Sequence, residues 1–268
     1  MTVASGNKDQ YNEMATEYTG YANLPMARLE AELIRTALGD LTGLTVLDLG
    51  GGSGTHARQA VRAGAQRVDV VDISEAMLQI GRDIEAATSA NSAEESRIRW
   101  HLADVSQPLS EQRGTVDVPR GGYDVAMANW VFDHALSPDD LRGMWLNIVT
   151  SLKPGGRFVG VRVHAPEPEV QSEYNPDTSK YGSKFTDTRE IPGGFYCVTT
   201  LLTDPPFSFG LTPMRDSYTL ANEIPKSLGM IDFAVVPDED TEIIKADPEF
   251  WKDHLEARSF VVVTAKKA

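Results

Sequence analysis

The sequence predicts an α/β fold in which a mostly parallel β-sheet is covered by helices. Two observations carry this prediction. Short apolar runs alternate with helical patterns through the first 165 residues, which is typical of consecutive strand–helix–strand units. A glycine-rich loop, Gly50–Gly54, directly follows the first apolar run. Parallel sheets bind ligands at the carboxyl ends of their strands, so this loop marks the first place to expect a site.

The first 165 residues contain a helical region followed by five predicted strands. Residues 8–38 carry apolar side chains at helical spacing, and Gly39 ends that pattern. Strands are predicted at residues 45–49, 67–71, 98–102, 123–128 and 156–163, with helices at 55–63, 74–87 and 139–151. Ser74 is a suitable N-cap, because its hydroxyl accepts from free amides of the first helical turn.

The pattern changes after residue 165. The next 50 or so residues are rich in proline and aromatic side chains and lose the clean alternation. Beyond them the sequence predicts helices at 217–228 and 248–257 and strands at 231–236 and 259–265. We expect one domain, divided into a helical cap (1–40), a core (41–165), an aromatic-rich insertion that acts as a lid (166–216) and C-terminal strands that complete the sheet (217–268).

The charge balance and cysteine content narrow the class of protein. The chain of 268 residues has 25 Lys and Arg against 39 Asp and Glu, a formal charge of −14. Nucleic acids and anionic membranes bind clustered cations, so neither is an expected partner. The single cysteine, Cys197, excludes an internal disulfide, and the N-terminus lacks the apolar stretch of a signal peptide. We expect a cytoplasmic monomer or homodimer that acts on a small molecule.

The glycine loop and two carboxylates predict a nucleotide-type cofactor. Glycines at 50, 52 and 54 let the backbone turn sharply, and the helix after them presents free amides. Asp72 ends the second strand, where a carboxylate suits the two hydroxyls of a ribose. Gly52, Gly54 and Ala57 also satisfy a loose dinucleotide pattern, so the loop by itself leaves two cofactor classes open.

Two further acids favour a cofactor that carries an ammonium group over a dinucleotide. Asp48 lies inside the strand end, where a carboxylate would repel a pyrophosphate but could hold an ammonium group. Asp104 ends the third strand, where it could accept from an adenine amino group.

With these motifs in order, the chain resembles a known family. The motifs are Asp48-x-Gly50-x-Gly52-x-Gly54, Asp72-Ile-Ser, Ala103-Asp104-Val, the run from Tyr123 to Asn129, and Leu152-Lys-Pro-Gly-Gly156. Together they resemble class I S-adenosylmethionine-dependent methyltransferases over residues 40–165. That resemblance implies a Rossmann-like, seven-stranded, mostly parallel sheet with helices on both faces. The segments from Tyr11 to Tyr21, from Tyr181 to Lys184 and from Pro248 to Trp251 are similar to the toxoflavin-synthase-like branch, which methylates small heteroaromatic metabolites.

The resemblance implies a role for each cofactor-binding residue. S-adenosyl-L-methionine would be the cofactor and S-adenosyl-L-homocysteine its product. Gly50, Gly51, Gly52 and Gly54 would pass the methionine part, with Asp48 at its amino group and Asn129 beside it. Asp72 would take the ribose hydroxyls, Ile73 and Met77 would pack on the nucleoside, and Asp104 and Val105 would contact the adenine. Tyr11 or Tyr18 would close the N-terminal side.

The candidates for chemistry and for acceptor binding each have a structural alternative. His134 follows the fourth strand and is the expected general base, with Asp133 as a group that could orient it. It could instead cap the loop before Pro138. Trp130 and Phe132 could line the acceptor site or simply pack in the core. Tyr181, Phe195 and Tyr196 could stack on a flat acceptor or form a small core of the insertion.

The expected function is methyl transfer to nitrogen or oxygen of a small planar metabolite, heteroaromatic or otherwise secondary. No metal is expected, because the acids at 139 and 140 suit the first turn of a helix. Two alternatives remain. One is an NAD(P)-dependent oxidoreductase that uses the same glycine loop, and the other is a methyltransferase-like cyclase or isomerase that binds the cofactor without transferring methyl.

Overall fold

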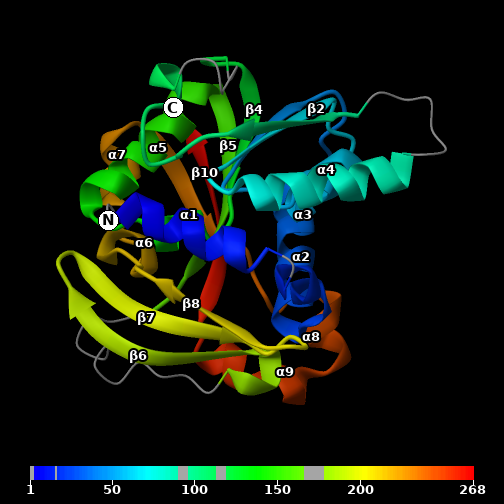
Figure 1. Cartoon of the computed structure of the whole chain (residues 1–268), viewed down its shortest axis with the longest axis vertical. Helices are drawn as coiled ribbons and strands as arrows, with labels where there is room; N and C mark the ends of the chain where they lie inside the picture. The colour runs from blue at the N-terminus through cyan, green and yellow to red at the C-terminus, as the bar shows by residue number, and fades with distance from the viewer. Residues whose placement is uncertain (1–2, 16, 90–95, 113–118, 166–177) are drawn as a thin grey trace.

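A seven-stranded sheet forms the centre of the chain (Figure 1). The computed structural model describes residues 3–15, 17–89, 96–112, 119–165 and 178–268. The strand order is β3-β2-β1-β4-β5-β10-β9, in which β1 to β5 are parallel and β10 is antiparallel to both of its neighbours. The strands are β1 (Thr45–Leu49), β2 (Arg67–Asp72), β3 (Ile98–Leu102), β4 (Tyr123–Ala128), β5 (Leu152–Val163), β9 (Met230–Val235) and β10 (Phe260–Lys267). The predicted fold class is confirmed.

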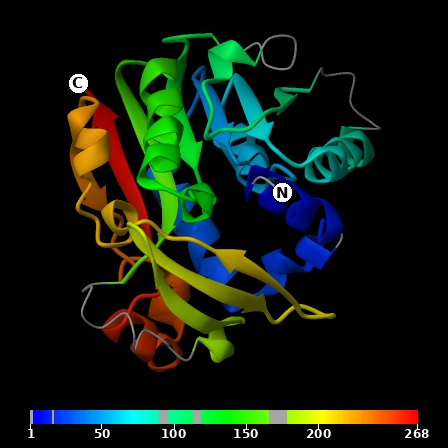
Figure 2. The same ribbon diagram turned by 60° about the vertical axis from the view of Figure 1, so that its left-hand side comes forward.

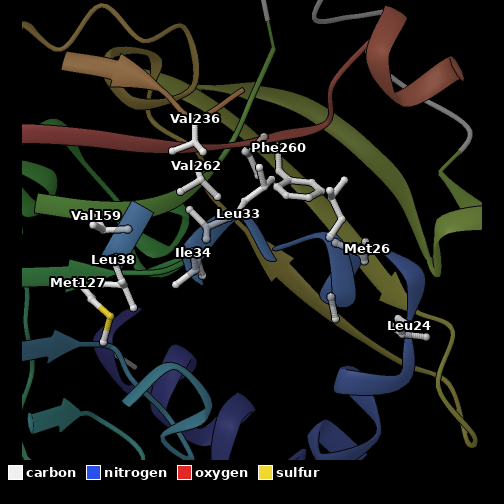
Figure 3. Close-up of a cluster of buried hydrophobic side chains, with 14 of the residues drawn as sticks. Leu24, Met26, Leu33, Ile34, Leu38, Met127, Val159, Val236, Phe260 and Val262 are labelled. Carbon is white, nitrogen blue, oxygen red and sulfur yellow. The ribbon is translucent and has the colours of Figure 1, made fainter. Parts of the chain in front are cut away.

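Helices cover both faces of this sheet because its strands alternate their apolar side chains between two cores. Val125 and Met127 of β4 point to one core, and Ala126 and Ala128 point to the other. The first core lies under α2 (Pro25–Leu38) and α3 (Thr55–Arg62), and the second under α5 (Pro138–Ser151). Figure 3 shows the first core, where Leu33, Ile34 and Leu38 of α2 lie near Met127, Val159 and Val262. The helix α4 (Glu75–Ser89) follows β2.

The N-terminal helical region is divided into three pieces. The predicted helix over residues 8–38 forms α1 (Val3–Glu13), the 3₁₀ helix η1 (Glu17–Asn23) and α2. Pro25 begins α2, where its fixed φ suits the first turn and its missing N–H is not needed. In Figure 1, α1 lies above the small sheet described next. Its Asn12 Oδ1 accepts from Ser74 Oγ at 2.7 Å, and its Gln10 Oε1 accepts from the Gly210 N–H at 3.2 Å.

The insertion forms a second, antiparallel sheet of three strands in the order β6-β7-β8 (Figure 2). They are β6 (Ser183–Ile191), β7 (Gly194–Leu201) and β8 (Phe207–Leu211), preceded by the 3₁₀ helix η5 (Ser179–Tyr181). The sequence did not predict these strands. Their side chains alternate, so that Phe195, Thr199 and Phe209 are buried on one face. Tyr196 lies on the other face, where the Arg189 guanidinium sits 4.3 Å from its ring centre.

The C-terminal part differs from the prediction in two helices. Residues 217–228 do not form one helix. They comprise the end of α6 (Arg215–Tyr218) and all of α7 (Glu223–Ser227). The two helices are separate because Leu220 and Asn222 between them have φ values of 60° and 56°. The side-chain oxygen Asn222 Oδ1 accepts from the buried Arg162 guanidinium at 2.6 Å, which helps to hold this break. The short helix α8 (Glu242–Ala246) was not predicted, whereas α9 (Pro248–Glu256) was. Two further 3₁₀ helices are η2 (Leu109–Glu111) and η3 (Val131–His134).

Gly143 of α5 provides a test of how tightly this helix packs. A methyl group on Gly143 would lie 2.1 Å from the carbonyl oxygen of Ser106, which is backbone and has little room to move. We expect Gly143→Ala to lower the free energy of unfolding, because overpacking costs about 1–3 kcal/mol and exceeds the gain in helix propensity. Urea denaturation measures the change. Leu146→Ala, at a side chain 41% exposed on the same helix, is the control and should change stability by less than about 0.5 kcal/mol.

Candidate functional site

A cavity of about 430 Å³ lies at the carboxyl ends of the parallel strands. Its walls come from the loop after β1, the end of β2, the segments after β3 and β4, and the N-terminal helices. Most of the site residues predicted from the sequence meet there: Tyr11, Tyr18, Asp48, Gly50, Gly51, Gly52, Asp72, Ile73, Met77, Asp104, Val105, Asn129, Trp130 and His134. The parallel strand order explains this meeting, because it brings the ends of distant segments to one edge.

The glycine loop folds closely over two carboxylates. The Gly52 N–H donates to Asp72 Oδ2 at 2.8 Å, and a Cβ on Gly51 would lie only 2.7 Å from Asp48 Oδ2. A side chain at position 51 would therefore displace Asp48 or fill the space beside it. Gly54 lies behind the cavity wall, in a left-handed conformation at the start of α3.

Asp48 is fully buried, and within the described residues neither of its carboxylate oxygens has a hydrogen-bond partner. Burial raises its pKa to about 7; nearby His56 opposes this shift and Asp72 adds to it. The side chain of Asn129, 8% exposed, also has both polar atoms unpartnered among the described residues. Buried polar groups normally have partners, so a ligand that carries hydrogen-bonding and cationic groups fits this end of the cavity.

Asp72 and Asp104 are held by backbone donors. Asp72 Oδ1 accepts from the Ser74 N–H at 2.8 Å, so this carboxylate is anchored through both oxygens. Burial raises its pKa, and its backbone donors oppose the shift. Asp104 Oδ1 accepts from Ser106 through the N–H at 2.9 Å and the hydroxyl at 2.7 Å. Both side chains keep acceptor capacity toward the cavity, since each oxygen has two lone pairs.

Glu30 is a cavity residue that sequence analysis missed. It is fully buried on α2 and accepts from His56 Nε2 at 2.8 Å, from Trp130 Nε1 at 2.9 Å and from the Tyr21 hydroxyl. A signal for it exists in the sequence. Glu30 lies four residues after Met26 on the apolar face of the helix, and a charged residue on a buried face needs partners.

Five ring-bearing residues separate this cavity from a smaller one of about 30 Å³. The residues that line both spaces are Tyr11, Tyr18, Tyr21, Trp130 and His134. We call the region between these five side chains the aromatic passage. The rest of the small cavity's wall is apolar except for Thr199. Apart from Met26, it comes from the inward face of the small sheet and includes Phe185, Leu201 and Phe209. Residues of the insertion therefore do contribute to this region, but not the ones selected from the sequence.

His134 and Tyr11 form a hydrogen-bonded pair in the aromatic passage. The Tyr11 hydroxyl lies 2.7 Å from His134 Nε2. Burial lowers the pKa of His134 to about 4 and raises the pKa of the Tyr11 phenol. Both side chains are therefore uncharged at neutral pH.

Four predicted acceptor residues do not line either cavity. Phe132 is buried in the second core, 4.8 Å from the ring of Trp145. Tyr181 stacks on Trp251 at 4.9 Å. Phe195 packs against Tyr218 at 5.0 Å, and Tyr196 points to the outer face of the small sheet. The positions of Phe132, Tyr181 and Phe195 match the core-packing alternatives, whereas Tyr196 is only half-buried.

Asp133 does not line either cavity, although it precedes His134 in the sequence. Its Oδ2 accepts from the Val163 N–H at 3.0 Å, and its side chain is fully buried. Burial raises its pKa to about 7, much as for Asp48.

Comparison with known proteins agrees with this geometry. Residues 46–156 match the family described as methyltransferase domain. The CcbJ methyltransferase from Streptomyces caelestis is 20% identical with a TM-score of 0.60, over 97% of each chain. An S-adenosylmethionine-dependent methyltransferase from Mesorhizobium loti is 19% identical with a TM-score of 0.53, over 87% of this chain and 95% of that one.

The [4+2]-cyclase SpnF is 16% identical with a TM-score of 0.59, over 98% of this chain and 96% of that one. No curated protein matches the sequence. The chain therefore has the Rossmann-like fold of these methyltransferases, and residues 46–156 are similar to the methyltransferase domain family. The likeness to the toxoflavin-synthase-like branch stays a prediction.

Metal sites and membrane-spanning helices are both absent from the described residues. In these ranges no group of three or more His, Cys, Asp or Glu side chains is placed to hold a metal ion. Among the helices of the same ranges, none has the length and apolar character needed to cross a membrane.

The pKa of Asp48 predicts a pH-dependent stability in the absence of ligand. Its folded-state pKa of about 7 lies above the value of about 3.9 for an unfolded chain, so the folded state binds more protons between these values. Stability contributed by this group falls as pH rises through that range. Asp48→Asn should remove this fall and raise the free energy of unfolding at pH 8 by more than about 1 kcal/mol. Urea denaturation at pH 5 and pH 8 measures the effect, and an unchanged pH slope would contradict it.

Proposed function

We propose that this chain binds S-adenosyl-L-methionine in the cavity and transfers its methyl group to nitrogen or oxygen of a small planar metabolite. The observation that carries the proposal is the buried Asp48 carboxylate, which has no protein donor among the described residues and lies beneath Gly51. It is a site for the amino group of an amino-acid ligand. The family match over residues 46–156 supports the same cofactor.

The cavity residues fit the parts of this cofactor in order. Asp48 and Asn129, both with unpartnered polar atoms, would hold its methionine end. Asp72 would accept from the ribose hydroxyls, and Ile73 and Met77 would pack on the nucleoside. Asp104 and Val105 would contact the adenine. When bound, the cofactor supplies an activated methyl group on a positively charged sulfur.

The charge of the cavity wall selects among acceptors. Five carboxyl groups line the cavity, from Glu30, Asp48, Asp72, Asp104 and Asp140. They favour a cationic cofactor and would repel an acceptor that carries phosphate or carboxylate. The aromatic passage offers ring faces on which a flat, uncharged acceptor can stack while water is excluded. We therefore assign the acceptor to the aromatic passage and the small cavity beyond it.

His134 is the proposed proton acceptor for this acceptor molecule. It lies in the passage, is neutral at neutral pH and is held by Tyr11. A weakly basic imidazole suits an acceptor whose N–H or O–H becomes strongly acidic as the new bond to carbon forms. Positioning of the two reactants by the surrounding walls supplies the rest of the catalysis.

Binding measurements separate this function from an NAD(P)-dependent oxidoreductase. Calorimetry should show binding of S-adenosyl-L-homocysteine and no comparable binding of NAD⁺ or NADP⁺, because Asp48 would face a pyrophosphate. Asp48→Asn and Asp72→Asn should each weaken S-adenosyl-L-homocysteine binding at least fivefold, through loss of a charge-assisted hydrogen bond. Asp133→Asn is the matched control, because Asp133 is equally buried but lies outside the cavity. Tight binding of NAD⁺ alone would refute the proposal.

The acceptor wall is tested once an acceptor is in hand. Mass spectrometry of co-purifying small molecules, followed by transfer of a labelled methyl group, identifies one. Phe209→Ala should then raise the acceptor KM far more than it weakens cofactor binding, because Phe209 lines the small cavity. Phe195→Ala is the control on the neighbouring strand, and an equal effect of the two variants would contradict the assignment. Conversion of the acceptor without incorporation of label would identify a cyclase or isomerase instead.

His134→Gln tests the proton acceptor. Loss of a general base lowers kcat by roughly 10²- to 10⁴-fold, while S-adenosyl-L-homocysteine affinity should stay within about twofold. Because the pKa of His134 is about 4, protonation of this group should not lower the wild-type rate between pH 6 and 8. If the wild-type rate falls by half near pH 6.5 and this fall is absent in His134→Gln, the pKa of His134 is normal and the expectation is wrong.

A further inference from the structure

Glu30 joins three segments that surround the cavity. Its Oε2 accepts from Trp130 Nε1, at the start of η3, and from the Tyr21 hydroxyl of η1. Its Oε1 accepts from His56 Nε2 at 2.8 Å, in the first turn of α3 behind the glycine loop. Trp130 and Tyr21 belong to the aromatic passage, whereas His56 lies at the cofactor end. A single buried carboxylate therefore connects the two halves of the site.

The contacts of His56 define its protonation state. Its second ring nitrogen, Nδ1, lies 3.3 Å from Gln59 Oε1. The orientation of that amide is settled by its other end, since Gln59 Nε2 donates to the Ala31 carbonyl oxygen. Both nitrogens of the imidazole therefore face oxygen atoms that only accept. A neutral imidazole has one N–H and would leave one of these contacts without a proton, whereas an imidazolium satisfies both.

The same pair acts on Asp48. Burial opposes a charge on His56, but the hydrogen bond and charge of Glu30, together with the charge of Asp48, raise its pKa above the usual value. A positive His56 in turn favours the ionised form of Asp48, whose own burial disfavours it. The groups that face His56 are thus Glu30 from α2, Gln59 from α3 and Asp48 from β1.

We infer that Glu30 and His56 form a carboxylate–imidazolium pair, with the carboxylate buried, that positions the site. The carboxylate fixes the Trp130 and Tyr21 side chains of the aromatic passage, and the imidazolium favours the ionised form of Asp48, which receives the cofactor's amino group. Glu30 and His56 are positioning residues, because they act through Trp130, Tyr21 and Asp48. The role assigned to Asp48 rests on the proposed function, whereas the ion pair itself does not.

The protonation state of His56 is measured without any ligand. The chain has five histidines, and long-range ¹H–¹⁵N spectra of histidine-labelled protein report how many ring nitrogens of each carry a proton. His56→Gln identifies the His56 signals by their loss. In the wild-type protein at pH 7.5 we expect both nitrogens of His56 to be protonated. A neutral His56 with a single N–H at this pH would overturn the pair.

Glu30→Gln tests the positioning role. This variant keeps an oxygen that can accept from Trp130 but removes the charge, so His56 should become neutral at pH 7.5. Tryptophan fluorescence, with Trp130→Phe to isolate this residue, should shift in the variant. S-adenosyl-L-homocysteine should bind at least threefold more weakly, and Glu30→Asp should recover part of the loss. An unchanged affinity and an unchanged Trp130 signal would overturn the role.

Glu32→Gln is the matched control on the same helix. Glu32 accepts from the Glu242 N–H at 2.6 Å and the Ile243 N–H at 3.1 Å, outside the cavity. This variant should leave the His56 spectrum and the ligand affinity as in the wild type. The two proposals fail separately. If wild-type protein shows the imidazolium but binds no S-adenosyl-L-homocysteine, the proposed function is wrong and the ion pair stands.

Discussion

The burial of Asp48 beneath the glycine loop is the constraint on which the site depends. The carboxylate shares a face of β1 with core residue Val46, and only a residue without a side chain fits beside it at position 51. A buried carboxylate without a donor disfavours the ligand-free folded state. The same carboxylate gains most from a cationic group that arrives with a ligand. Stability without ligand and affinity for the ligand therefore oppose each other at this residue.

The N-terminal helix joins the two sheets and closes the cavity between them. Three consecutive residues of α1 each bond a different element: Gln10 to β8, Tyr11 to His134 of η3, and Asn12 to Ser74 before α4. Tyr11 also lies 6.0 Å from Phe209, ring centre to ring centre. The aromatic passage is thus assembled from segments that lie more than 100 residues apart in the sequence, around Tyr11 and around His134. Its shape depends on α1 and on Glu30, which orders the opposite side.

Much of the central fold could be predicted from the sequence, because it rests on local patterns. The five parallel strands, the glycine loop and the acids at the strand ends all follow from periodicity and from residues a few positions apart. The parallel order then brings Asp48, Asp72 and Asp104 to one cavity, as the sequence predicted. The break between α6 and α7 could not be read this way, since it depends on the contact of Asn222 with Arg162, 60 residues away.

The sequence by itself thus determined the central sheet, the glycine loop and the carboxylates that line the cavity at the sheet's edge. The tertiary structure decided which aromatic side chains meet the cavity. In a strand, neighbouring residues point to opposite faces, so Phe209 reaches the small cavity and Tyr196 does not. Phe195 shares the inward face but lies at Tyr218, beyond the cavity. Register and docking of the small sheet set these positions, and the partners of Glu30, up to 100 residues away, come together only in the folded chain.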